Sequence, residues 1–272
     1  MLNMKSLKSI LEASILADID DQLEAGDVSL RESVIEYLDE NYSYRGKLTI
    51  SDEPNKDGKY EVSVKSNVKI INHKITSLTN GLFEWTKVDG YFNCSHCEKL
   101  TSLEGAPREV GDSFYCDCCY LLKSLEGAPI KVKYDFGCLN CTSLTSLEGA
   151  PKEIGGGFKC SSCDSLLTLY GVPEKINSYF YCENCHKLLS LHGAPKEVGG
   201  EFNCSYCESL KNLKCAPKKV GSYFSCSICK SLTSLEGAPK EVGQNFYCYD
   251  CGAEFTKDDV KKVSNVKGII CC

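Results

Sequence analysis

Apolar and polar positions recur along this chain with a period of 22 residues. In the unit from Phe136 to Gly157, an aromatic residue, two cysteines, two leucines and one aliphatic residue hold places that the neighbouring units repeat. The first cysteine recurs at Cys94, Cys116, Cys138, Cys160, Cys182, Cys204, Cys226 and Cys248. The second follows at Cys97, Cys119, Cys141, Cys163, Cys185, Cys207, Cys229 and Cys251. Self-similarity at a fixed period of about 20 to 50 residues is typical of stacked repeats, so the pattern predicts a solenoid.

Each unit begins with a Phe-x-Cys alternation, such as Phe180-Tyr-Cys182. Alternation predicts a short strand with the phenylalanine and the cysteine inward and the middle residue outward. Glycine and proline recur at Gly149, Pro151 and their equivalents, which excludes a helical arm. Cys215 replaces this glycine once, which indicates a corner that does not depend strictly on a left-handed glycine. We therefore expect a parallel β-sheet with short irregular, extended or 3₁₀ returns, anchored by an aliphatic residue on the back face.

The first 45 residues read as a helical segment. Apolar residues at helical spacing predict one helix from Ser6 to about Gly26. A second helix, capped by Asp27 or Ser29 and running to about Asn41, would bury Val34, Ile35 and Leu38. Two interpretations stay open: a cap packed on the solenoid, or an amphipathic segment that docks on a partner or an assembly.

Residues 46–67 predict a β-hairpin, because alternating runs lie on both sides of a turn-rich segment. The hairpin would cover the first edge of the repeat stack. The solenoid is expected over residues 68–255, starting with a degenerate unit at Val68. Residues 256–272 form the C-terminal cap, with a helix from Thr256 through Val263 and an apolar tail on the final rung.

Composition narrows the class of partner. A formal charge of −6 and an isoelectric point near 5.4 oppose a nucleic-acid-binding surface, which needs a basic face. No apolar run is long enough to span a membrane, and Glu12 with Asp18 interrupts the apolar core that a signal peptide requires. We therefore expect a cytoplasmic protein with no membrane or nucleic-acid partner.

The twenty cysteines favour a structural role. Cys-x-x-Cys is half of many zinc sites, and thiol-redox work or disulfides are further alternatives. In-register parallel strands, however, place equivalent residues about 4.8 Å apart in unbroken columns, whereas zinc sites need isolated groups of four. We therefore expect buried core thiols with no metal and no cofactor. Cys118 is the exception, at an outward or loop position.

No catalytic constellation is evident. His73, His96, His186 and His192 occupy unrelated repeat positions. His186 adjoins Cys185, but neighbours along a strand point to opposite faces, so they do not form a nucleophile pair. The chain carries neither a phosphate-binding loop nor a His-Glu-x-x-His motif. We expect that the protein is not an enzyme.

The row Phe136, Cys138, Cys141, Leu144 resembles the leucine-rich-repeat core Leu-x-Leu-x-x-(Asn/Cys)-x-x-Leu. The string Cys141 to Leu147 is similar to the cysteine-containing, BspA-like class, and the Ser-Leu-Glu-Gly-Ala-Pro units resemble leucine-rich-repeat proteins of bacteriophages and gut bacteria. The resemblance covers roughly residues 68–255. It implies a curved right-handed solenoid with a parallel sheet and a role in binding other macromolecules. It also implies a location in the cytoplasm of a bacterium or of a phage-infected cell, or an association with a virion. The Gly-Ala-Pro corner departs from the surface-antigen pattern.

The units differ most at the outward residue between Phe and Cys and at the residue before Phe. Tyrosine recurs there, and exposed tyrosines are typical anchors of protein interfaces; tyrosine also favours strands for structural reasons. The candidate binding residues are Tyr91, Tyr115, Asp135, Lys159, Tyr179, Tyr181, Glu201, Tyr223 and Tyr247. The back face, with Lys152-Glu153 and similar pairs, is expected to be solvated. The sequence thus predicts a scaffold that binds another protein; a metal-binding or thiol-redox protein and a phage structural or accessory protein are the alternatives.

Overall fold

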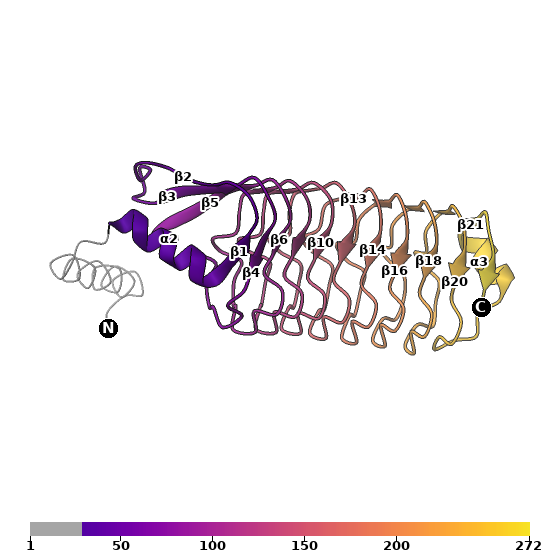
Figure 1. Ribbon diagram of the computed structural model, residues 1–272. Helices are drawn as coiled ribbons and strands as arrows, with labels where there is room; N and C mark the ends of the chain where they lie inside the picture. The colour runs from indigo at the N-terminus through magenta and orange to yellow at the C-terminus, as the bar shows by residue number, and fades with distance from the viewer. Residues whose placement is uncertain (1–28) are drawn as a thin grey trace.

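The computed structural model describes residues 29–272, which form one elongated β-solenoid of about ten turns (Figure 1). The helix expected from Ser6 to Gly26 lies outside the described residues. The sequence-based prediction of a parallel repeat solenoid with a helix and a hairpin near its N-terminal end is confirmed. Among the described residues, no helix combines the length and the apolar composition needed to cross a membrane.

One side of the solenoid is an 11-stranded sheet, which we call the front sheet. Except at β1, its strands are parallel and in register, so that Phe136 lies beside Phe114 on one side and Phe158 on the other. In order its strands are β1 (Tyr42–Tyr44), β4 (Val68–Ile70), β6 (Phe92–Asn93), β8 (Phe114–Tyr115), β10 (Phe136–Gly137), β12 (Phe158–Lys159), β14 (Phe180–Tyr181), β16 (Phe202–Asn203), β18 (Phe224–Ser225), β20 (Phe246–Tyr247) and β22 (Ile270–Cys271).

The returns on the opposite side also contain strands, which form two back sheets. The first comprises β2 (Leu48–Ile50), β3 (Tyr60–Val64), β5 (Phe83–Val88), β7 (Glu109–Val110), β9 (Lys131–Val132) and β11 (Glu153–Ile154). The second comprises β13 (Lys175–Ile176), β15 (Glu197–Val198), β17 (Lys219–Val220), β19 (Glu241–Val242) and β21 (Asn265–Val266). No 3₁₀ helix occurs in residues 29–272. The extended form of the expected return is therefore the one adopted, and it pairs between turns.

The back sheets separate between β11 and β13. In neighbouring turns the corner is tied down by a bond such as Ala150 N to Leu147 O, 3.0 Å. The corner that precedes β13 carries Val172 where these turns have alanine, and the corresponding bond to Leu169 is absent there. The larger side chain explains why this corner cannot close in the same way, and the pairing with the preceding turn is lost.

The stack in Figure 1 is extended and shows little of the horseshoe curvature that the leucine-rich-repeat resemblance implies. Curvature requires units that are wider on one side than on the other. Here hydrogen-bonded strands set the spacing on both sides, at about 4.8 Å per turn. Equal spacing front and back keeps the axis nearly straight.

Columns of identical side chains fill the interior. Successive phenylalanine rings lie 5.0–5.6 Å apart between centroids, most of them stacked, and none is accessible to solvent. The two leucine columns are equally buried. Burying a side chain of this size contributes about 1.5–3 kcal/mol. The inward orientation predicted for the repeated apolar row is confirmed.

The thiols form two hydrogen-bonded ladders that bridge adjacent turns. Cys116 Sγ donates to Gly137 O at 3.3 Å, and Cys141 Sγ donates to Cys116 O at 3.1 Å. The same two bonds recur along the array with sulfur–oxygen distances of 3.1–3.6 Å. Cysteine suits this place because it packs as a small apolar residue and still carries a weak donor for a buried carbonyl.

Two places in each turn have left-handed backbone. One is the corner glycine, as at Gly149 with φ 88°, and Cys215 adopts φ 69° at the same place. The corner therefore requires the left-handed conformation even without glycine. The other, which the sequence pattern did not reveal, is the residue before the second cysteine, with φ from 54 to 63° at His96, Cys118, Asn140, Ser162, Asn184, Tyr206, Ile228 and Asp250. Cys118 thus lies in a turn, half-buried, as the sequence indicated.

The N-terminal end of the stack is closed by helix α2 (Leu30–Asn41) and by strands. Ser29 and Glu32 form a capping box, and Val34 and Leu38 are fully buried against the core, whereas Ile35 is only partly buried. β1 pairs antiparallel with β4 and ends the front sheet, while the predicted hairpin β2–β3 ends the first back sheet. Both exposed sheet edges are covered in this way.

The C-terminal end is closed by α3 (Lys257–Val263), which begins at the predicted Thr256 capping box. The tail then adds β21 to the second back sheet and β22 to the front sheet, in parallel with β20. The apolar tail therefore lies on the final rung, as the sequence indicated.

Candidate binding face

The outer side of the front sheet carries all nine candidate residues, each of them half-buried. They occupy two columns, one before each phenylalanine and one after it. The strand alternation continues outward at a third column, one residue after the first cysteine, which holds Asp117 and Glu183. The predicted binding residues did not include this third column, although the same alternation of inward and outward residues extends to it.

Tyr179 and Tyr181 form the centre of this surface. Their rings stack with centroids 4.7 Å apart, and Lys159 Nζ lies 5.0 Å from the centroid of the Tyr179 ring. Burial, followed by the neighbouring Asp135 carboxylate, raises the pKa of Tyr179 well above its ordinary value. Asp135 is fixed in turn, because its Oδ1 accepts the backbone N–H of Gly157 at 2.7 Å. The turns are thus joined side chain to side chain on the outside as well as on the inside.

Two glycines in these columns provide space for tyrosines of neighbouring turns. A Cβ atom on Gly157 would lie 2.3 Å from Cε2 of Tyr179, and one on Gly137 would lie 2.9 Å from Cδ1 of Tyr115. The tyrosine rings therefore lie across the adjacent strands. A ring held in this way loses little conformational freedom when a partner binds it.

The surface continues toward the C-terminal end. Burial and the neighbouring Tyr223 hydroxyl raise the pKa of Tyr181. Tyr223 also contacts Tyr247 edge-on, with centroids 5.9 Å apart. Tyr91 lies at the other end of the sheet, and none of the ring contacts between described residues joins it to the other tyrosines. We call the joined set the tyrosine band: Tyr115, Asp135, Lys159, Tyr179, Tyr181, Glu201, Tyr223 and Tyr247.

The band and its third column are acidic. From Tyr115 to Tyr247 the columns hold four carboxylates but one cation, Lys159, whereas Lys69 lies in the same column nearer the N-terminal end. The carboxylates are Asp117, Asp135, Glu183 and Glu201. Asp117 accepts the backbone N–H of Leu139 at 2.7 Å, yet burial still raises its pKa. Oε2 of Glu183 is shielded from solvent and has no hydrogen-bond partner among the described residues. A buried carboxylate oxygen without a donor favours a ligand that supplies one.

The opposite side of the solenoid carries a different surface. Its charged residues form exposed pairs between turns, such as Lys131 Nζ to Glu153 Oε2 at 3.0 Å and Lys219 Nζ to Glu241 Oε2 at 3.8 Å. Exposed pairs of this kind contribute little free energy. The pairs join residues 22 positions apart, so the expected charge-paired back face is present with its partners on adjacent turns.

Burial makes several of the interior cysteines poor nucleophiles. Burial raises the pKa of Cys97 to about 12 and that of Cys116 and Cys185 well above the ordinary value, so the nucleophilic thiolate is disfavoured. His186, which adjoins Cys185 in the sequence, faces Asp164 at 4.0 Å. Within residues 29–272, no three His, Cys, Asp or Glu side chains converge as a metal site would require.

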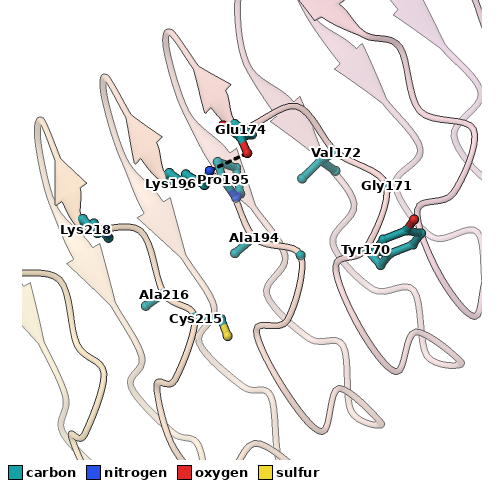
Figure 2. A pocket seen from close by; sticks show the side chains of 11 residues that line it. Tyr170, Gly171, Val172, Glu174, Ala194, Pro195, Lys196, Cys215, Ala216 and Lys218 are labelled. Atoms are coloured by element: carbon teal, nitrogen blue, oxygen red, sulfur yellow. Dashed lines mark hydrogen bonds and ion pairs between the residues drawn. The ribbon is translucent and has the colours of Figure 1, made fainter.

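A groove of about 530 Å³ runs along the corners of three turns, from Tyr170 to Lys218 (Figure 2). These corners are Gly-Val-Pro, Gly-Ala-Pro and Cys-Ala-Pro. Its glutamate, Glu174, pairs with Lys196 of the next turn. Figure 2 shows the Cys215 side chain apart from this pair. The groove lies beside the corner that Val172 disturbs, and its walls are mainly small corner residues. It therefore belongs to the scaffold and brings no acid, base and nucleophile together.

Comparisons with protein-family models, with curated proteins and with solved structures find no match to this chain. The solenoid and its outer face are therefore the observations from which a function can be argued.

Proposed function

We propose that this protein is a non-enzymatic scaffold of the leucine-rich-repeat kind, close to the BspA-like type, that binds another protein through the tyrosine band. The band itself carries the proposal. It combines several half-buried aromatic rings, fixed by contacts between turns, on the one side of the solenoid whose residues change from unit to unit. Rigid tyrosines are typical anchors of protein interfaces.

The charge of the band supports a basic partner. Four carboxylates face outward against one lysine, and Glu183 retains an oxygen without a donor. Arginine or lysine side chains would supply donors to these oxygens and would pack on the tyrosine rings by cation–π contact, as Lys159 already does. We therefore propose that the partner presents a segment rich in Lys and Arg, in a reducing cytoplasm that suits the free thiols of the chain.

A fluorescent peptide rich in Lys and Arg tests this proposal, with an acidic peptide of the same length as its counterpart. We expect the basic peptide to bind with an affinity that falls as salt increases. Glu183→Gln with Glu201→Gln removes two charges from the front side. Glu153→Gln with Glu197→Gln removes the same net charge from the back side. The front pair should weaken binding about tenfold or more, and the back pair by less than about twofold.

Tyr179→Ala with Tyr181→Ala should also weaken binding by about tenfold or more, because the aromatic anchors are removed. Circular dichroism of each variant separates loss of binding from loss of fold. If the front and back double variants weakened peptide binding equally, binding would depend only on the net charge of the protein, and the proposed binding face would be refuted. Comparable binding of the acidic peptide would refute the proposed partner.

A further inference from the structure

One pair of thiols near the C-terminal end of the described chain differs from the two interior ladders. Cys248 Sγ lies 3.2 Å from Cys272 Sγ, whereas the interior thiols point to main-chain carbonyls. We infer that Cys248 and Cys272 form a reversible disulfide that fastens the last turn of the solenoid when a low-molecular-weight disulfide such as oxidised glutathione is present. This oxidation site is independent of the tyrosine band and of any partner that binds there.

The fold brings the two residues together from adjacent strands. β20 and β22 pair in parallel, with Tyr247 beside Cys271, so the residues that follow, Cys248 and Cys272, are the next pair in register. Between them lies the C-terminal cap with α3. Equivalent residues in neighbouring strands have a Cα separation compatible with a disulfide, so only a small movement of the end of the chain is needed.

The pair is also accessible, unlike the interior columns. Cys272 is exposed, and a pocket of about 460 Å³ is lined by Lys230 and by three thiols, Cys248, Cys251 and Cys272. A small disulfide can reach the thiols through this pocket. Lys230 adds a positive charge to the lining of this pocket, which attracts the carboxylates of glutathione. Cys251 also lines the pocket, but it is half-buried and its Sγ donates to Cys226 O at 3.2 Å, whereas Cys272 is exposed.

The chemistry proceeds by thiol–disulfide exchange in two steps. The exposed Cys272 thiolate attacks one sulfur of the oxidised glutathione, which forms a mixed disulfide and releases one glutathione thiolate. Cys248 Sγ then attacks Cys272 Sγ, gives up its proton to the second departing glutathione, and closes the intramolecular bond. Two protein thiols are oxidised and one glutathione disulfide is reduced to two thiols. Burial and the neighbouring Cys272 raise the pKa of Cys248, which makes Cys272 the residue that attacks first.

The disulfide would attach the C-terminal cap covalently to the last turn of the solenoid. Without it, the cap is held on the last turn by the two-residue strands β21 and β22 and by apolar packing. With it, the chain from Cys248 to Cys272 becomes a closed loop, which restricts unfolding from this end. In a repeat array, unfolding that starts at an end propagates inward, so a fastened end delays loss of the whole stack.

The test uses the full chain, equilibrated with mixtures of reduced and oxidised glutathione and then blocked with an alkylating agent. Peptide mapping by mass spectrometry should find the Cys248–Cys272 cross-link at mixtures in which the interior thiols are still alkylated as free thiols after denaturation. The oxidised protein should melt at a higher temperature than the reduced protein. Cys272→Ser should abolish both the cross-link and the shift, while Cys215→Ser, at an exposed thiol elsewhere, should leave both unchanged.

Three outcomes would overturn the inference. A stable glutathione adduct on Cys272 without closure would show that Cys248 does not reach it. A cross-link of Cys248 to Cys251 or Cys271 in preference to Cys272 would assign the wrong pair. Cross-links among interior cysteines that form at the same or milder mixtures would show that the terminal pair has no special reactivity.

Discussion

The two sides of the same front strands differ in what they repeat. On the inner side, phenylalanine and cysteine recur without change for eight turns. On the outer side of those strands, the residue that follows each phenylalanine is tyrosine, glycine, lysine, asparagine or serine. Both sides are joined between turns, but the inner side joins identical residues and the outer side joins unlike ones, such as Tyr179 over Gly157.

The cause of this difference is the in-register translation of the stack. An inner side chain has its own copy above and below, so a change of shape in one turn disturbs two neighbours at interior packing density. An outer side chain has solvent on one side and can be accommodated by a small neighbour. The inner side therefore fixes the period and the outer side is free to specify a partner.

The largest expected effect is a loss of folding stability at high pH, which arises from the cysteines on the inner side of the strands. Burial raises the pKa of thirteen cysteines, at positions 94, 97, 116, 119, 138, 160, 182, 185, 204, 207, 226, 229 and 248. Above the ordinary thiol pKa of 9.0, the unfolded chain loses protons that the folded chain keeps, so the free energy of unfolding falls as pH rises. Each thiol contributes about 1.4 kcal/mol per pH unit, so the thirteen together contribute on the order of 20 kcal/mol per pH unit above that pKa.

Because this loss is comparable with the whole stability of a domain, the reduced protein should unfold cooperatively between about pH 9 and about pH 11. The thiol stabilisation should be complete below that window. Circular dichroism and thiolate ultraviolet absorbance, recorded together under reducing conditions, check this expectation. Gradual appearance of thiolates while the strand signal persists would show that the inner thiols titrate in the folded state.

The second prediction compares the loss of stability caused by two substitutions at neighbouring residues of β14. Phe180→Ala empties a place in the inner column and should lower the free energy of unfolding by about 3–5 kcal/mol. Tyr181→Ala removes a ring of similar size from the outer side and should cost about 1 kcal/mol, because that ring is half-buried and stacked on Tyr179. Urea denaturation of both variants checks the ratio. Similar losses would mean that the outer side is as much a part of the core as the inner side.

The sequence alone predicts the side of the solenoid that repeats. Phe136, Cys138 and their copies mark the inner row, and Ser29 and Thr256 mark the two helix starts that the structure contains. These features follow from local alternation, spacing and capping, which short stretches of chain reveal. The candidate tyrosines were placed on the outer side for the same reason.

Other features depend on neighbours in the adjacent turn, which a single unit does not display. The ring of Tyr179 over Gly157 joins two turns, as does the bond from the Cys141 thiol to the Cys116 carbonyl. The close approach of Cys248 to Cys272 depends on how the cap returns the chain to the last rung. The straight axis likewise follows from pairing on the back side, where two-residue strands are too short to leave an alternating pattern.

The smallest expected effect concerns the corner, which repeats for a reason that neither side of the strands supplies. Gly149 and its equivalents recur because the backbone there has φ near 88°, and Cys215 adopts φ 69° in spite of its Cβ atom. Cys215 is exposed, so its side chain makes little contribution to packing. Left-handed backbone costs a non-glycine residue about 1–2 kcal/mol, and glycine adds entropy to the unfolded chain. Cys215→Gly should therefore raise the free energy of unfolding by about 1 kcal/mol or slightly less. Cys215→Ser, which keeps the Cβ atom, should leave it unchanged; urea denaturation of both variants under reducing conditions makes the comparison. A gain with serine as well would assign the effect to the thiol, and a loss with glycine would show that this corner has adapted to its cysteine.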